Sequence, residues 1–189
     1  MINQSQQLEL FPEVTQDTQL VHTINISAVP TFMAAASQPF NSVQTLELYH
    51  NHITREELKE YRDSYAVLEY HLELLEQRNG YHQVPLATII KFLDGCIDSI
   101  WTIASECYAL GVSPVELFNE IALSNLSKIP ENGQIEKNSA GKVLKPAGYF
   151  KPNLIQYVVD SPVIQRLTGL SKEELVELAE LEAARNGSR

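Results

Sequence analysis

Cysteine is scarce in this sequence of 189 residues, which contains only Cys96 and Cys107. Both lie in an apolar helical pattern, where a free cysteine behaves as a small buried hydrophobe. We therefore expect two reduced core thiols, as is typical of a cytoplasmic protein. No CxxC pair, a common signature of a zinc site, occurs in the chain.

The sequence also lacks a targeting signal and a long apolar run. Its start, MINQSQQLELF, has neither the basic region nor the apolar region of a signal peptide. No stretch approaches the roughly 18 apolar residues that a transmembrane helix needs. We therefore predict a cytoplasmic protein with no membrane partner.

Basic residues are too few for a protein that binds nucleic acid non-specifically. The chain has 14 Lys and Arg against 24 Asp and Glu, a formal net charge of -10, whereas such a binder needs a basic face. We expect no nucleic-acid partner. A polyanionic ligand remains compatible with this charge, because bound metal ions can reverse its sign locally. A glycine-rich phosphate loop is missing as well, since AGKVLKPAG does not have the Walker spacing.

What the sequence does contain is helical periodicity. Apolar residues recur at helical steps from about Thr45 to Gln77, and Leu86 to Leu110 is apolar on most sides, which is typical of a central helix. Ser113 with Glu116, and Ser171 with Glu174, have the spacing of capping boxes at the start of two further helices. The pattern predicts an all-α fold, a four- to five-helix bundle with a long irregular loop after the fourth helix and a C-terminal helix.

The same pattern divides the chain into three regions. Residues 1–28 have no sustained period and are expected to form a flexible arm. Residues 29–154 form the helical domain, and 155–189 a C-terminal helical extension. Within the domain, residues 129–153 are expected to form a long ordered loop, which could include a short hairpin. A loop of that length is uncommon unless it is functional.

The apolar central helix also predicts an assembly. Because this helix is apolar on most sides, we expect another subunit to cover one of its faces. The sequence therefore predicts a homodimer or homotetramer. An active site near that interface could draw the long loop from a neighbouring chain.

Two groups of acidic residues stand on neighbouring predicted helices. ITREELKEY contains Glu56, Glu57 and Glu60, and the central helix carries Asp94 and Asp98. Residues three or four apart share a helix face, and carboxylates in one apolar interior repel each other unless a cation lies between them. Two antiparallel helices would thus gather oxygen ligands suited to Mg²⁺, or alternatively Mn²⁺.

Both acidic groups also have a purely structural interpretation. Thr54 and Glu57 fit a capping box at a helix start, although the apolar run from Leu46 to Ile53 indicates that the helix has already begun. Asp94 and Asp98 could instead bond hydroxyl or backbone groups at a partly exposed helix edge.

Basic and aromatic residues gather after the fourth predicted helix. Lys128, in SNLSK, and Lys145 are suitable phosphate contacts, and an aromatic ring near them could stack on a base. The alternative is that Lys128 neutralises a helix C-terminus and the aromatic rings cover the edge of the core. The candidate residues in this region are Lys128, Lys142, Lys145, Tyr149 and Phe150.

These motifs together resemble the all-α NTP pyrophosphatase superfamily, the MazG-like and phosphoribosyl-ATP pyrophosphohydrolase-like proteins. The superfamily has EExxE on one helix and ExxD on the next. EELKE matches the first half, and DGCIDSIW occupies the second. The stretches GVSPVELFNEIALSNLSK and GKVLKPAGYFKPNL are similar to the end of MazG-like proteins that bacteriophages often encode. If this chain is encoded by a bacteriophage, the resemblance implies that it acts in the host cytoplasm. The similarity covers about residues 30–154.

The resemblance implies hydrolysis of a nucleoside triphosphate to the monophosphate and pyrophosphate. It implies that Glu57, Glu60, Asp94 and Asp98 bind metal, and that Glu56 is a supporting acid or the base that activates water. It also implies that Asn125 binds the substrate through a phosphate, the sugar or the base, beside Lys128, Lys142, Lys145, Tyr149 and Phe150. Together, Glu56 and Glu57 are the predicted catalytic residues. One position departs from the pattern: Gly95 stands where ExxD has its Glu, and Asp94, one turn before Asp98, is the candidate replacement. This departure motivates the alternative of a nucleotide-binding protein without catalysis, and a helical adaptor is the third hypothesis.

Overall fold

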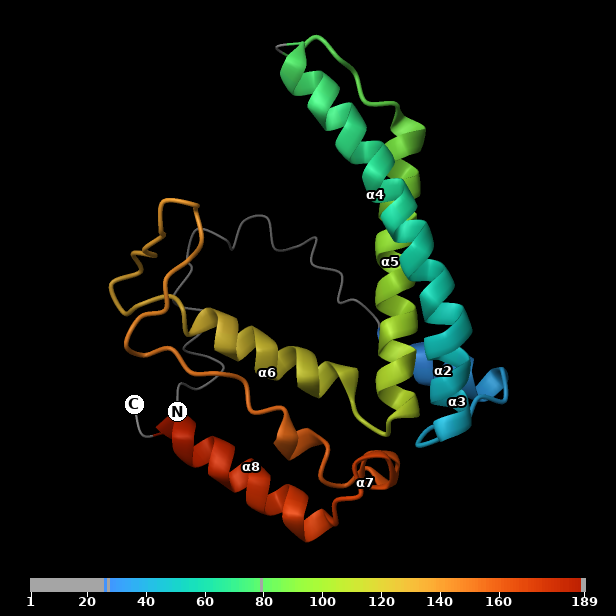
Figure 1. The fold of residues 1–189 in the computed structure, drawn as a ribbon, viewed down its shortest axis with the longest axis vertical. Helices are drawn as coiled ribbons and strands as arrows, with labels where there is room; N and C mark the ends of the chain where they lie inside the picture. The colour runs from blue at the N-terminus through green and yellow to red at the C-terminus, as the bar shows by residue number, and fades with distance from the viewer. Residues whose placement is uncertain (1–25, 27, 79, 188–189) are drawn as a thin grey trace.

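The computed structural model describes residue 26, residues 28–78 and residues 80–187, and these are entirely free of β-strands. The all-α prediction is therefore confirmed for this part of the chain (Figure 1). The predicted arm, residues 1–28, lies outside the described residues except for Ile26 and Ala28. The α-helices of the domain are α2 (Ala28–Ala35), α3 (Val43–Leu48), α4 (Thr54–Gln77), α5 (Leu86–Ala109) and α6 (Pro114–Leu126), and those of the C-terminal region are α7 (Pro162–Thr168) and α8 (Lys172–Gly187).

The helix that carries the three glutamates begins at α3, well before α4. The hydroxyl of Ser42 caps α3 by accepting from the backbone N–H of Thr45. The chain then passes without a break through one π-helical turn, η3 (Tyr49–Ile53), into α4. The capping-box interpretation of Thr54 is wrong, because Thr54 is buried within this continuous helix and its side chain makes no cap hydrogen bond.

Helices α4 and α5 form a long antiparallel hairpin, which is the tall element of Figure 1. Gly95 of α5 lies against the backbone of Tyr61 on α4, and the small residues Ser99 and Thr102 are buried further along α5. Because Gly95 has no side chain, the two helices approach closely there. Phe92 of α5 packs against Tyr61 and Tyr65 of α4, and Trp101 packs against the core. Most of the other large apolar side chains of α5 lie on its far side.

That far side of α5 is exposed in the single chain. Leu86, Ile90, Leu93, Ile97 and Ile100 follow each other at steps of four and three, and Leu86 and Ile97 are 71% and 61% exposed. The expectation that α5 is covered on most sides therefore does not hold within one chain. The helix packs along α4, with α2, α3 and α6 contacting it as well.

The buried core lies at the base of the hairpin. Val29 and Met33 of α2 pack with Tyr49 and Ala104, and half-buried rings such as Trp101 surround them. The phenol of Tyr49 donates to Oε1 of Gln38, 2.7 Å away, which satisfies its polar group. Cys96 and Cys107 are free and half-buried, and burial is the main cause that raises the pKa of the Cys107 thiol.

The second half of the chain forms a separate arm. Helix α6 begins at Pro114 with the predicted cap, because the Ser113 hydroxyl accepts from the backbone N–H of Glu116. It leaves the base of α5 and runs away from the hairpin (Figure 1). The loop after α6 contains a short hairpin, as the sequence analysis allowed. An antiparallel bridge between Lys137 and Val143 closes this hairpin.

The C-terminal extension lies against this arm. A short 3₁₀ turn, η4 (Ile155–Tyr157), contacts α8. The predicted capping box of α8 is present in both directions: Ser171 N–H donates to Glu174, and Glu174 N–H donates to the Ser171 hydroxyl. Within the described residues, no helix is long and apolar enough to cross a membrane.

Candidate active site

The contact between α4 and α5 positions the predicted metal ligands. A Cβ atom added to Gly95 would lie 3.0 Å from the Cα atom and 3.2 Å from the N atom of Tyr61. Contacts this short to a neighbouring backbone leave no room for a larger side chain unless the helices separate. Position 95, where the ExxD pattern has a glutamate, is thus a point at which the two helices touch.

The five predicted carboxylates lie around this contact, on one side of the hairpin. Glu57 is half-buried, whereas the other four side chains are exposed. The pKa of Glu57 is raised, first by burial and then by the negative charges of Asp98, Glu60, Glu56 and Asp94, in that order. Both helices therefore contribute charges close enough to act on one carboxylate, as the sequence predicted.

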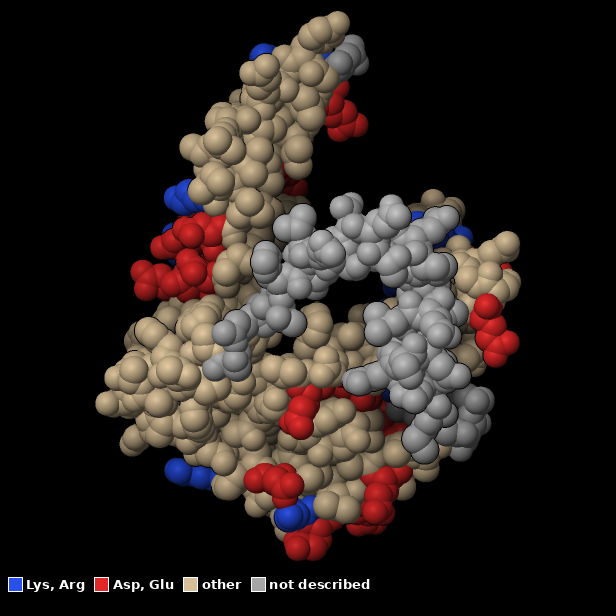
Figure 2. Space-filling model, turned by 180° about the vertical axis from the view of Figure 1, so that it is seen from behind, with Lys and Arg blue, Asp and Glu red and all other residues tan. Residues whose placement is uncertain are grey.

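Asp94 and Asp98 themselves do not lie in an apolar interior. Both side chains are exposed on the single chain. Their position therefore fits the alternative interpretation, a partly exposed helix edge, better than it fits an apolar interior. Figure 2 shows acidic side chains gathered on one side of the hairpin, while much of its remaining visible surface is uncharged. The acidic cluster thus faces solvent.

The donor chemistry of this cluster fits a divalent cation. Carboxylate oxygens are the ligands that Mg²⁺ and Mn²⁺ prefer, and mutual repulsion at Glu57 is the condition that a cation relieves. In the part of the chain that the structure describes, no three His, Cys, Asp or Glu side chains are arranged closely enough to enclose a metal ion. The exposed carboxylates would have to rotate toward Glu57 to share one.

The predicted substrate-binding residues form a second cluster at the end of α6. The Lys145 Nζ atom lies 4.5 Å from the centre of the Tyr149 ring, and Lys128 Nζ lies 6.0 Å from it. Lys128 Nζ also donates to Oδ1 of Asn125. Desolvation alone would raise the pKa of Tyr149, but a hydrogen bond with Ser124 and the charges of Lys145 and Lys128 outweigh it and lower that pKa.

Lys142 has a different setting from these residues. It lies in the short hairpin of the loop, where its backbone N–H donates to Oδ1 of Asn138 at 2.9 Å and its carbonyl accepts from the Asn138 N–H. Its backbone therefore helps to close the turn, and its side chain is exposed.

The sequence analysis missed the residues that hold the loop against α6. The Ser124 hydroxyl donates to the carbonyl of Phe150 at 2.9 Å, and the Phe150 N–H donates to the Ser127 hydroxyl at 3.2 Å. The sequence feature that could have predicted this anchor is a pair of serines three residues apart at the end of a helix. Serine is disfavoured in a helix unless its hydroxyl finds a hydrogen-bond partner. The SNLSK motif thus combines anchoring serines with Asn125 and Lys128.

A second anchor lies further along the loop and was also missed. Glu120 of α6 accepts from the backbone N–H of Asn153 at 2.7 Å and from the Tyr157 hydroxyl at 3.2 Å. The Asn153 amide donates in turn to the carbonyl of Ala179 in α8. These bonds join α6, the loop and the C-terminal extension into one unit.

The two clusters lie on different arms of the molecule. The carboxylates are on the α4–α5 hairpin, and the Lys–Tyr cluster is at the end of α6 that points away from α5 (Figure 1). A comparison with models of protein families found no matching family, and a comparison with curated proteins found no match.

Proposed function

We propose that this chain is a metal-dependent nucleoside triphosphate pyrophosphohydrolase, which releases the monophosphate and pyrophosphate. The observation that carries the proposal is the close contact of α4 and α5 at Gly95 and Tyr61, beside which both helices carry predicted carboxylates. Burial first, and then the charges of these carboxylates, raise the pKa of Glu57. Further support comes from the cluster of Lys128, Lys145 and Tyr149, which offers cations for phosphates and a ring for a base.

The roles follow from residue chemistry. Glu57, Glu60, Asp94 and Asp98 would hold Mg²⁺, or Mn²⁺, which when bound neutralises phosphate charge and lowers the pKa of a coordinated water. Glu56, exposed beside Glu57, is available as the base that takes the proton from the attacking water. Protonated Lys128 and Lys145 would balance the charge on the phosphates.

We propose that a second copy of this chain completes the site. Two observations favour this arrangement: the carboxylates and the Lys–Tyr cluster lie on separate arms of one chain, and the far side of α5 is a continuous apolar surface. Helix α6 also carries exposed apolar side chains, such as Phe118 at 67%. A partner covering α5 would bury this surface and bring its own loop near the hairpin.

A second candidate function is nucleotide binding without turnover, in which the protein stores or senses a nucleotide. The observation that favours it is the close contact at Gly95, which removes one carboxylate from the site. A site with fewer ligands could bind a nucleotide–metal complex and still lack the charge needed for catalysis.

A mixed panel of ribo- and deoxynucleoside triphosphates, incubated with Mg²⁺ and separately with Mn²⁺, distinguishes these functions. Monophosphate and pyrophosphate in equal amounts support the pyrophosphohydrolase. Thermal stabilisation by nucleotide and metal without product supports the binding protein. Neither product nor stabilisation supports the helical adaptor. The panel includes all common bases.

A further inference from the structure

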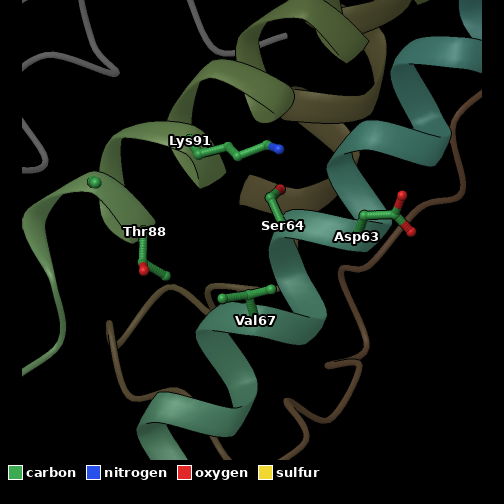
Figure 3. A pocket seen from close by; sticks show the side chains of 6 residues that line it. Asp63, Ser64, Val67, Thr88 and Lys91 are labelled. Atoms are coloured by element: carbon green, nitrogen blue, oxygen red, sulfur yellow. The ribbon is translucent and has the colours of Figure 1, made fainter.

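A cavity of about 300 Å³ lies between α4 and α5, lined by Asp63, Ser64, Val67, Ala87, Thr88 and Lys91 (Figure 3). Its position along the hairpin follows from helical spacing. Asp63 stands three residues after Glu60 on α4, and Lys91 stands three residues before Asp94 on α5, so each is about one turn from a predicted metal ligand. The cavity therefore adjoins the carboxylate cluster.

Lys91 is the only Lys or Arg in the sequence of α5. Its side chain extends toward α4, whereas the carboxylate of Asp63 points away from the cavity (Figure 3). Asp63 is already paired, because the Lys59 amine donates to it at 2.8 Å. Lys91 thus places a positive charge at the cavity, about one helical turn from Asp94 on its own helix. The pKa of Asp63 on α4 is lowered, first by the hydrogen bond and charge of Lys59 and to a smaller extent by the charge of Lys91.

We propose that Lys91 binds a phosphate group of the substrate at the edge of this cavity. The inference rests on the proposed function and adds a residue to the same site. An ammonium group one turn from the carboxylates can reach a phosphate whose other oxygens are held through metal ions. The cavity gives that phosphate room on the hairpin itself, in addition to the phosphate contacts proposed for Lys128 and Lys145.

The test is isothermal titration calorimetry of the full chain with two probes, Mg²⁺ alone and inorganic tripolyphosphate in the presence of Mg²⁺. Lys91→Met should bind tripolyphosphate about tenfold more weakly, the loss expected for one charge-assisted hydrogen bond. Lys91→Arg should bind within about threefold of the wild type, because the charge remains. Mg²⁺ alone should bind Lys91→Met at least as tightly as the wild type, since a repelling cation has been removed.

A matched control is Arg62→Met, which removes an exposed cation from the same hairpin. The Arg62 guanidinium donates to the carbonyl of Leu58 on its own helix, and its loss should leave both titrations unchanged. Equal tripolyphosphate affinity in Lys91→Met and the wild type would overturn the assignment of Lys91 and leave the proposed function standing. No binding of tripolyphosphate to the wild type, together with no nucleotide turnover, would overturn both.

Discussion

Gly95 of α5 and Tyr61 of α4 meet backbone to backbone, since a Cβ atom at Gly95 would lie 3.0 Å from the Tyr61 Cα atom. This contact sets the register of the hairpin. Glu57 and Glu60 stand just before Tyr61, and Asp94 and Asp98 flank Gly95, so the register brings the carboxylates of the two helices together. Position 95 is thus needed for the packing of α5 on α4.

Filling position 95 should destabilise the protein. In an exposed helix interior, Gly→Ala gains about 1 kcal/mol, but overpacking costs about 1 to 3 kcal/mol. We expect Gly95→Ala to lose about 1 kcal/mol of unfolding free energy in urea, and Gly95→Glu at least about 2 kcal/mol. Gly148→Ala, in open space, is the control and should stay within about 0.5 kcal/mol of the wild type. A Gly95→Ala protein that is more stable than the wild type would contradict the close contact.

Removing the charge of Glu57 should stabilise the metal-free protein at neutral pH. Because the pKa of Glu57 is raised in the fold, its stabilising contribution is present below the unfolded-state pKa and is lost as pH rises through the folded one. In EDTA at pH 7, Glu57→Gln should therefore exceed the wild type by about 0.5 kcal/mol, the size of a like-charge helix pair. The difference should vanish toward pH 4.

Adding Mg²⁺ should reverse that order. The ion should stabilise the wild type and leave Glu57→Gln nearly unchanged, because a ligand has been removed. Glu69→Gln, an exposed charge on the same helix, should respond to Mg²⁺ as the wild type does. Equal Mg²⁺ stabilisation of all three proteins would place the ion elsewhere.

The serines of SNLSK should separate anchoring from substrate binding. Ser124→Ala and Ser127→Ala each remove a hydrogen bond to the backbone of Phe150 and should cost about 1 kcal/mol, with faster hydrogen exchange in the loop. Lys128→Met should leave stability within about 0.5 kcal/mol of the wild type, because the side chain is partly exposed, and should weaken nucleotide binding. Loss of stability in Lys128→Met would favour the structural interpretation of that residue.

A charge on the far side of α5 should break the assembly. Ile97→Glu introduces a carboxylate on the exposed apolar surface, and in sedimentation velocity it should convert a dimer or tetramer to a monomer. Leu167→Glu, on α7 and 55% exposed, is the control and should keep the wild-type sedimentation coefficient. A monomeric wild type would contradict the proposed interface.

Complementation tests whether neighbouring chains share a site. Glu57→Gln and Lys145→Met should each be inactive alone, because one lacks a metal ligand and the other a phosphate contact. In a mixed assembly, one site can combine an intact hairpin with an intact loop from the other chain. When two variants assort at random into dimers, about half of the dimers contain one chain of each, and one of the two sites in such a dimer is intact. We therefore expect recovery of about a quarter of wild-type activity or less. No recovery in mixed assemblies would place both residues in the same chain's site.

Local rules predicted much of the fold. The caps at Ser113 and Ser171 and the extents of the two long helices follow from short-range hydrogen bonding and periodicity. The π turn at Tyr49–Ile53 could not be predicted, because no Pro or Gly marks it and it depends on how Tyr49 packs. The exposure of Ile97 could not be predicted either. Periodicity indicates that a helix has an apolar face, but it does not indicate which part of the protein covers that face.

The candidate site residues stay a prediction, and the contacts that hold the loop beside them were not predicted. Acid spacing identified the carboxylates that act on Glu57, and the loop motif identified Tyr149 with two lysines. The roles of Ser124 and Glu120 depend on contacts with residues about 26 to 37 positions away, which no local pattern encodes. The function of Gly95 likewise depends on which residue of α4 it meets.

The most direct test of the account is identification of the products formed from each nucleoside triphosphate in Mg²⁺. The account predicts equimolar monophosphate and pyrophosphate from at least one nucleotide, their loss in Glu57→Gln and their retention in Glu69→Gln. Release of diphosphate and orthophosphate, or no product from any nucleotide with Mg²⁺ or Mn²⁺, would contradict it.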